Sequence, residues 1–97
     1  MSHNITRIVK MTFDPARVND FLSVFNENRD RIAGFEGCMA LELHHELSQP
    51  NVFFTISKWR SENDLEQYRS SELFQKTWAR TKTLFAAKPE AWTLARQ

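Results

Sequence analysis

Apolar residues recur in this chain either every two residues, as in a strand, or about every 3.6 residues, as in a helix. The order in which these two periods alternate constrains the fold more than any other feature. Residues 4–13 alternate, with Arg7 among apolar residues on one side, which predicts a strand. Residues 15–33 then repeat apolar side chains at helical spacing. Asp14 suits the N-cap of that helix, because Pro15 follows at its first position.

The second half of the chain adds a hairpin. Residues 38–46 and 52–59 are rich in strand-forming residues, and Pro50 and Asn51 between them are typical turn residues. We therefore expect two antiparallel strands joined by a four-residue loop.

A second helical pattern follows the hairpin. Ser61 and Asp64 resemble a capping box, and a helical stripe continues to about residue 85, with Ser70-Ser71 as a break or a second cap. Pro89 ends any helix, and residues 90–95 predict a short final strand.

The resulting order is β-α-β-β-α-β. This order predicts an α+β, ferredoxin-like fold with a four-stranded antiparallel sheet and the helices on one face. The 97 residues suit one small domain, residues 1–97.

The hairpin register follows from the four-residue loop. Leu47 then lies opposite Val52, and His45 pairs with Phe54, all facing the helices. The pattern disfavours the alternative register, in which Glu42 pairs with Ile56.

The run "LELHHE" at residues 41–46 suggests a metal site at first sight. Successive strand residues point to opposite faces, so His44 and His45 cannot bind the same ion. Glu42, His44 and Glu46 share one face, but the opposite strand adds only hydroxyl groups, whereas zinc and calcium need several ligands. We expect no metal there, and a half-solvated polar row instead.

Composition narrows the function. The net charge is +1 and the basic residues are scattered, so no strong electrostatic field is expected to attract nucleic acid or an anionic membrane. No apolar run is long enough to span a bilayer. Two glycines are too few for a nucleotide-binding loop. A single cysteine, Cys38, and no signal peptide indicate a cytoplasmic protein.

Aromatic residues make up 12 % of the chain. Three interpretations are open: these rings line a cavity, they bury a face against a partner, or they fill the core. A cavity between sheet and helices would receive polar groups from His45, Arg7 and Tyr68. Its walls would come from Trp78, Phe54, Phe74 and Phe21. The other sheet face, with Phe53 and Trp59, would need cover, which predicts a homodimer.

Three stretches also resemble the antibiotic biosynthesis monooxygenase family, within the dimeric α+β barrel group. They are "GFEGCMALEL" at residues 34–43, "SKWRSENDLEQY" at 57–68 and Ser71-Glu72-Leu73-Phe74. The resemblance covers about residues 5–95. It implies a dimer whose two sheets form a barrel, and a substrate bound between sheet and helices. It also implies oxygenation of aromatic polyketides or quinols without metal or flavin.

The chain departs from the family pattern at its polar residues. Tyr68 stands where many members carry a histidine, and a second family histidine near Glu72 or Leu73 is absent. The haem-degrading branch uses an Asn on the first strand, where Arg7 and its neighbours stand here. Its Trp and its haem-ligating His correspond to Tyr68 and Trp78.

We therefore weigh three functions. The first is a cofactor-independent monooxygenase acting on a small aromatic or quinol, with His45 as base, since its ordinary pKa lies nearest neutrality, and Arg7 and Tyr68 as partners. The second is a non-catalytic small-molecule-binding or stress-related dimer on the same fold. Haem degradation ranks last. No cofactor is expected.

Overall fold

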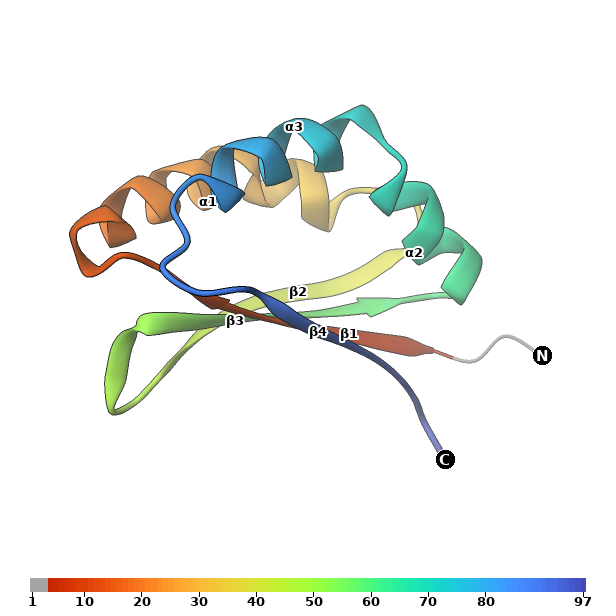
Figure 1. The fold of residues 1–97 in the computed structure, drawn as a ribbon. Coiled ribbons are helices and arrows are strands. Elements are labelled where there is room, and N and C mark those ends of the chain that lie inside the picture. The colour runs from red at the N-terminus through yellow and green to blue at the C-terminus, as the bar shows by residue number, and fades with distance from the viewer. Residues whose placement is uncertain (1–3) are drawn as a thin grey trace.

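The computed structural model, which describes residues 4–97, has two layers: a four-stranded sheet and three α-helices that cover one of its faces (Figure 1). Its strands run in the order β2-β3-β1-β4, and each neighbouring pair is antiparallel. This arrangement confirms the ferredoxin-like α+β fold. The elements are β1 (Ile5–Thr12), a 3₁₀ turn (Pro15–Arg17), α1 (Val18–Ala33), β2 (Cys38–Glu46), β3 (Gln49–Trp59), α2 (Glu62–Arg69), α3 (Glu72–Lys82) and β4 (Glu90–Ala95).

Short polar residues fix the helix ends. The Asp14 carboxylate accepts a hydrogen bond from the Ala16 N–H (2.9 Å), but it caps the 3₁₀ turn, so α1 begins only at Val18. Ser61 and Ser71 each accept a hydrogen bond from the N–H three residues ahead, both at 3.1 Å. The second of these caps divides the predicted long helix into α2 and α3.

The hairpin register differs from the predicted one by one residue. His45 pairs with Phe53, and Glu42 pairs with Ile56, which is the alternative that the apolar pattern disfavoured. The loop has two residues, because Glu46 pairs with Gln49 and its carboxylate accepts hydrogen bonds from the N–H and Oγ of Ser48 (3.1 and 2.6 Å).

Asn51 explains why the turn is shorter than predicted. Its amide donates to the Phe13 carbonyl (3.0 Å), and the Phe13 N–H donates to the Asn51 carbonyl (2.9 Å). These bonds hold Asn51 in β3 beside the end of β1, and an irregularity after His45 absorbs the extra residues. Odd-numbered residues of β3 therefore face the helices.

This shift corrects two surface assignments. Phe53 and Trp59, predicted on the uncovered face, are 6 % and 0 % exposed and lie in the core under the helices. Phe54, predicted as a cavity wall, pairs with Lys10 and His44 on the opposite face. That face carries no helix in Figure 1, and we call it the open face. Its apolar side chains include Ile8, Phe54, Ile56, Trp92 and Leu94.

The core on the covered face is built from stacked rings. Phe13 is fully buried, and its ring lies 4.1 Å from that of Phe21 and 5.9 Å from that of Phe53. Ile5, Trp59 and Leu65 form a second cluster at the other end of the sheet. Within residues 4–97, no helix is both long and apolar enough to cross a membrane.

Candidate functional site

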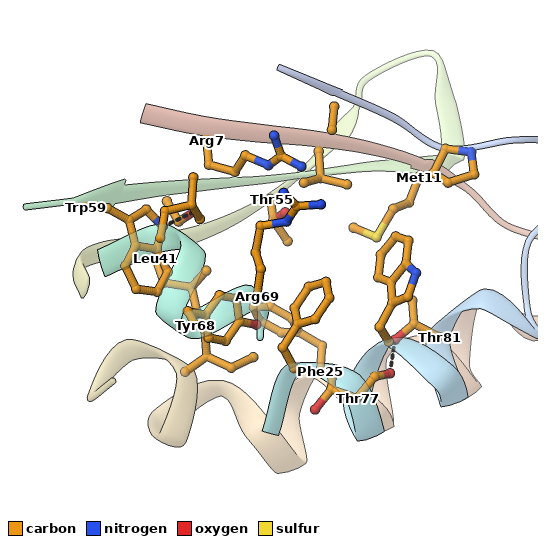
Figure 2. Close-up of a pocket in the computed structure, with 18 of the residues that line it drawn as sticks. Arg7, Met11, Phe25, Leu41, Thr55, Trp59, Tyr68, Arg69, Thr77 and Thr81 are labelled. Atoms are coloured by element: carbon orange, nitrogen blue, oxygen red, sulfur yellow. Dashed lines mark hydrogen bonds between the residues drawn. The ribbon is translucent and has the colours of Figure 1, made fainter. Parts of the chain in front are cut away.

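A cavity of about 260 Å³ lies between the sheet and the helices (Figure 2). The strands contribute Val9, Met11 and Leu41 to one side of it, and the helices contribute Phe25 and Thr77 to the other. Its volume is slightly below the roughly 300–1,000 Å³ of drug-sized ligand sites. The space therefore suits a small molecule.

Aromatic rings from β3 and the helices line much of the cavity wall. The Trp59 and Tyr68 rings stack with centroids 5.0 Å apart, and the Phe74 and Trp78 rings stack at 5.9 Å. Tyr68 and Phe74 meet edge to face at 5.3 Å and join the two stacks. Such a wall binds flat apolar molecules by offset and edge contacts.

Arg7 brings a positive charge into the cavity from β1. Its Nη1 donates to Thr93 Oγ1 (2.6 Å) on the neighbouring strand β4, which fixes the direction of the side chain. Partial burial lowers the pKa of Arg7 from its ordinary value; the Arg69 charge also lowers it, and Glu66 opposes them. Arginine remains charged despite such shifts.

Arg69 also lines the cavity, although its sequence position did not mark it as a site residue. It lies at the end of α2, and Figure 2 shows its side chain extending from the helical side towards the sheet on which Arg7 lies. Its Nη1 is 3.5 Å from the exposed carboxylate of Glu66. The signal was present in the sequence: Arg69 follows Leu65 by four residues, so both lie on the helix face turned to the sheet, although 42 % of the Arg69 side chain is exposed.

Tyr68 contributes a phenol to the same space. Burial, with a smaller contribution from Cys38, raises the pKa of its hydroxyl to about 12. The hydroxyl makes no hydrogen bond within the described chain, and no fully buried polar side-chain atom there lacks a partner. The group therefore contacts the cavity space and remains a protonated donor at neutral pH.

His45 does not reach this cavity. Its side chain is exposed near the hairpin, its Nδ1 donates to the Glu46 carbonyl (3.1 Å), and its ring meets the edge of Phe53 at 6.1 Å. Of the other residues predicted from sequence, the structure places Phe54 on the open face. It brings five of them together on the cavity wall: Arg7, Tyr68, Trp78, Phe74 and Phe21.

Glu42, His44 and Glu46, which share one face of β2, make separate contacts. The His44 Nε2 lies 2.7 Å from Glu42 Oε1, while the Glu46 carboxylate turns to Ser48. Among residues 4–97, no three His, Cys, Asp or Glu side chains gather closely enough to hold a metal ion.

Comparison with known proteins identifies the family. The model of the antibiotic biosynthesis monooxygenase family matches residues 4–80. The chain belongs to this family. No curated protein matches it.

Solved structures similar to this antibiotic biosynthesis monooxygenase family member share its fold at low identity. A conserved protein from Methanosarcina mazei Go1 has a TM-score of 0.94 at 19 % identity, with 98 % of this chain and 94 % of that chain covered. A Pseudomonas aeruginosa protein has 0.87 at 22 %, with 100 % and 97 % covered. An antibiotic biosynthesis monooxygenase has 0.87 at 16 %, with 93 % and 95 % covered.

The positions at which this chain departs from the family pattern lie at the cavity. Tyr68 and Trp78, which the sequence resemblance matches to the Trp and His of the haem-degrading branch, both lie on the wall. His44 and His45 are both outside it, so neither imidazole in the described chain faces the space. The polar character of the cavity comes from two guanidinium groups, a phenol and a few hydroxyls, with the Glu90 carboxylate at the rim.

Proposed function

We propose that the protein is a cofactor-independent monooxygenase acting on a small aromatic or quinol bound between the sheet and the helices. The observation that carries this proposal is the aromatic-walled cavity with Arg7, Arg69 and Tyr68 on its lining. Few polar groups in a mostly apolar space are typical of small-molecule sites. Membership of the antibiotic biosynthesis monooxygenase family supports the proposed reaction class.

The reaction needs only the substrate and oxygen. An anthrone, for example, loses one proton from its CH₂ carbon, and the resulting enolate carbon forms a bond to O₂ to give a hydroperoxide. The O–O bond then breaks as the second hydrogen leaves that carbon, and the products are a quinone carbonyl and water. The substrate supplies all four electrons that reduce O₂, so no external reductant is consumed.

The side chains would stabilise the substrate oxyanion rather than take the proton. Arg7 and Arg69 carry positive charge, and Tyr68 donates a hydrogen bond because its pKa of about 12 keeps it protonated. Such donors lower the pKa of a bound enol or phenol and stabilise charge in the transition state. The proton is then released to water.

Glu90 is not the base in this proposal, although it lies at the cavity rim. It pairs with Lys10 across the strands, and their side chains form an ion pair at 3.6 Å. Lys10 alternates with Val9, a cavity residue, so this pair belongs to the open face.

Oxygen uptake with a panel of anthrones and quinols tests the proposal. We expect consumption of one O₂ per substrate, and we expect the His45→Asn variant to retain the wild-type rate and pH profile, because His45 lies outside the cavity. No uptake above the protein-free rate for any substrate, beside an active relative, would refute the oxygenase. A His45→Asn rate reduced tenfold would refute the base-free mechanism.

One observation favours a second candidate, a non-catalytic small-molecule-binding protein. Among residues 4–97, the cavity lining has no imidazole, and its one carboxylate, Glu90, forms an ion pair with Lys10. Ligand binding without oxygen uptake would establish that function. Haem degradation has no support from a cavity imidazole, and it remains last.

We also propose that the protein is a homodimer formed through the open face, in a cytoplasmic setting that suits its one free cysteine. Trp92 and Leu94 are 43 % and 47 % exposed there, and Ile8, Phe54 and Ile56 are half-buried. An apolar sheet face without helices is commonly covered by a second sheet.

Light scattering at micromolar concentration checks the dimer. We expect twice the 11.5 kDa chain mass for the wild type and a shift towards one chain mass for Trp92→Glu. Leu47→Glu is the control, because Leu47 is 92 % exposed at the hairpin tip. A wild-type mass of one chain would contradict the proposal.

A further inference from the structure

The cavity holds two guanidinium groups that approach from opposite layers. Arg7 comes from β1 in the sheet, and Arg69 comes from the end of α2 (Figure 2). The two charges are close enough that Arg69 lowers the pKa of Arg7. Two like charges at one end of a small, largely apolar space repel each other, and a bound anion would reverse that cost.

The carboxylates around the pair leave room for such an anion. Glu66 contacts Arg69 at 3.5 Å, but it is 60 % exposed and is not on the cavity lining. Glu90 is engaged by Lys10 on the open face. Within residues 4–97, Glu90 is therefore the one carboxylate on the cavity lining, and it pairs with Lys10 rather than with Arg7 or Arg69.

Thr93 leaves much of Arg7 free for a ligand. Among the contacts of residues 4–97, its guanidinium makes one hydrogen bond, from Nη1 to Thr93 Oγ1 at 2.6 Å. A guanidinium carries five N–H donors in a planar fork, which matches the two oxygens of a carboxylate. Lysine would supply charge without this geometry.

We propose that the ligand is an aromatic carboxylate, with its rings against Tyr68, Phe74 and Trp78 and its carboxylate between Arg7 and Arg69. The aromatic stacks and the arginine pair are parts of one lining, so a single flat molecule with an anionic end reaches both. The small volume limits it to a compact ring system. This inference rests on the proposed function only in that both use this cavity.

Isothermal titration with two matched probes tests the proposal. 2-Naphthoate and 2-naphthamide have the same rings, and they differ in the charge of one planar group. We expect 2-naphthoate to bind the wild type at least about tenfold more tightly, since hydrogen bonds to charged groups are the stronger ones. Arg7→Gln and Arg69→Gln should each reduce this preference by about fivefold or more, while 2-naphthamide binding changes little.

Two further variants separate charge from geometry. Arg96→Gln removes one positive charge from an exposed position outside the cavity, and it should keep the full preference. Arg69→Lys keeps the charge but loses the fork, and it should give an intermediate preference. Circular dichroism and thermal melts establish that each variant is folded.

Each other outcome overturns the inference. Equal affinity for the two probes, or an unchanged preference in both arginine-to-glutamine variants, contradicts the role of the pair. Failure of both probes to bind contradicts the ligand class. Binding of 2-naphthoate without oxygen uptake from any substrate would leave this inference standing while the oxygenase fails. Oxidation of neutral quinols with no carboxylate preference would do the reverse.

Discussion

Trp59→Ala is expected to lower the free energy of unfolding by about 3–5 kcal/mol. Trp59 is fully buried, its ring stacks on Tyr68 at 5.0 Å, and its Nε1 donates to Ser57 Oγ (2.9 Å). The alanine would leave a large void at the junction of β3 and α2 and an unpaired hydroxyl. Because small domains are stable by only about 5–15 kcal/mol, this single change removes much of the total.

Urea unfolding followed by circular dichroism measures this loss. Trp59→Phe is the matched variant: it keeps an aromatic ring for Tyr68 but loses the indole N–H, so a smaller loss is expected. Leu47→Ala, at an exposed site, should change stability by less than about 0.5 kcal/mol. A Trp59→Ala loss below about 1 kcal/mol would contradict the burial on which the core assignment depends.

Tyr68→Phe is expected to lower the kcat of oxygen uptake by about 100-fold, if the proposed oxygenase uses the phenol as an oxyanion donor. The substitution removes one hydroxyl and keeps the ring that stacks on Trp59 and meets Phe74. Since that hydroxyl has no partner within the described chain, the loss should come without a large change in melting temperature. Initial rates from an oxygen electrode, with melting curves of both proteins, measure the effect.

The pH profile separates a donor from a base. Burial raises the pKa of Tyr68 to about 12, so the phenol stays protonated from pH 6 to 9 and should cause no inflection there. A Tyr68→Phe enzyme with the wild-type kcat would exclude the donor role. A wild-type inflection in that range that disappears in Tyr68→Phe would show that the phenol acts as a base instead.

Local signals were sufficient to predict the elements of the fold. The Ser61 and Ser71 caps, the alternation of β1 and the breaking effect of Pro89 each act within a few residues, and the structure has the corresponding boundaries. The hairpin register was wrong because it depends on a distant contact. Asn51 bonds to Phe13, 38 residues earlier, and this tertiary bond outweighed its turn propensity.

That one-residue error accounts for most of the site errors. It placed Phe54 in the cavity and Phe53 and Trp59 on the open face, all by parity along β3. His45 was assigned to the correct side of the sheet, but it lies too close to the hairpin to reach the cavity. Arg69 was missed because a charged residue at the end of a helix ordinarily faces solvent.

The parity of the central strands has a consequence for how such proteins diverge. Along β1 and β3, each cavity residue, such as Val9 or Thr55, has sequence neighbours on the open face, such as Ile8 and Phe54. A substitution at an odd-numbered position of these strands alters the cavity, and a substitution at an even-numbered position alters the open face. The two surfaces share the same backbone but not the same side chains. Ligand preference is therefore free to drift through point mutations while the open face, the surface of the proposed dimer, keeps its side chains.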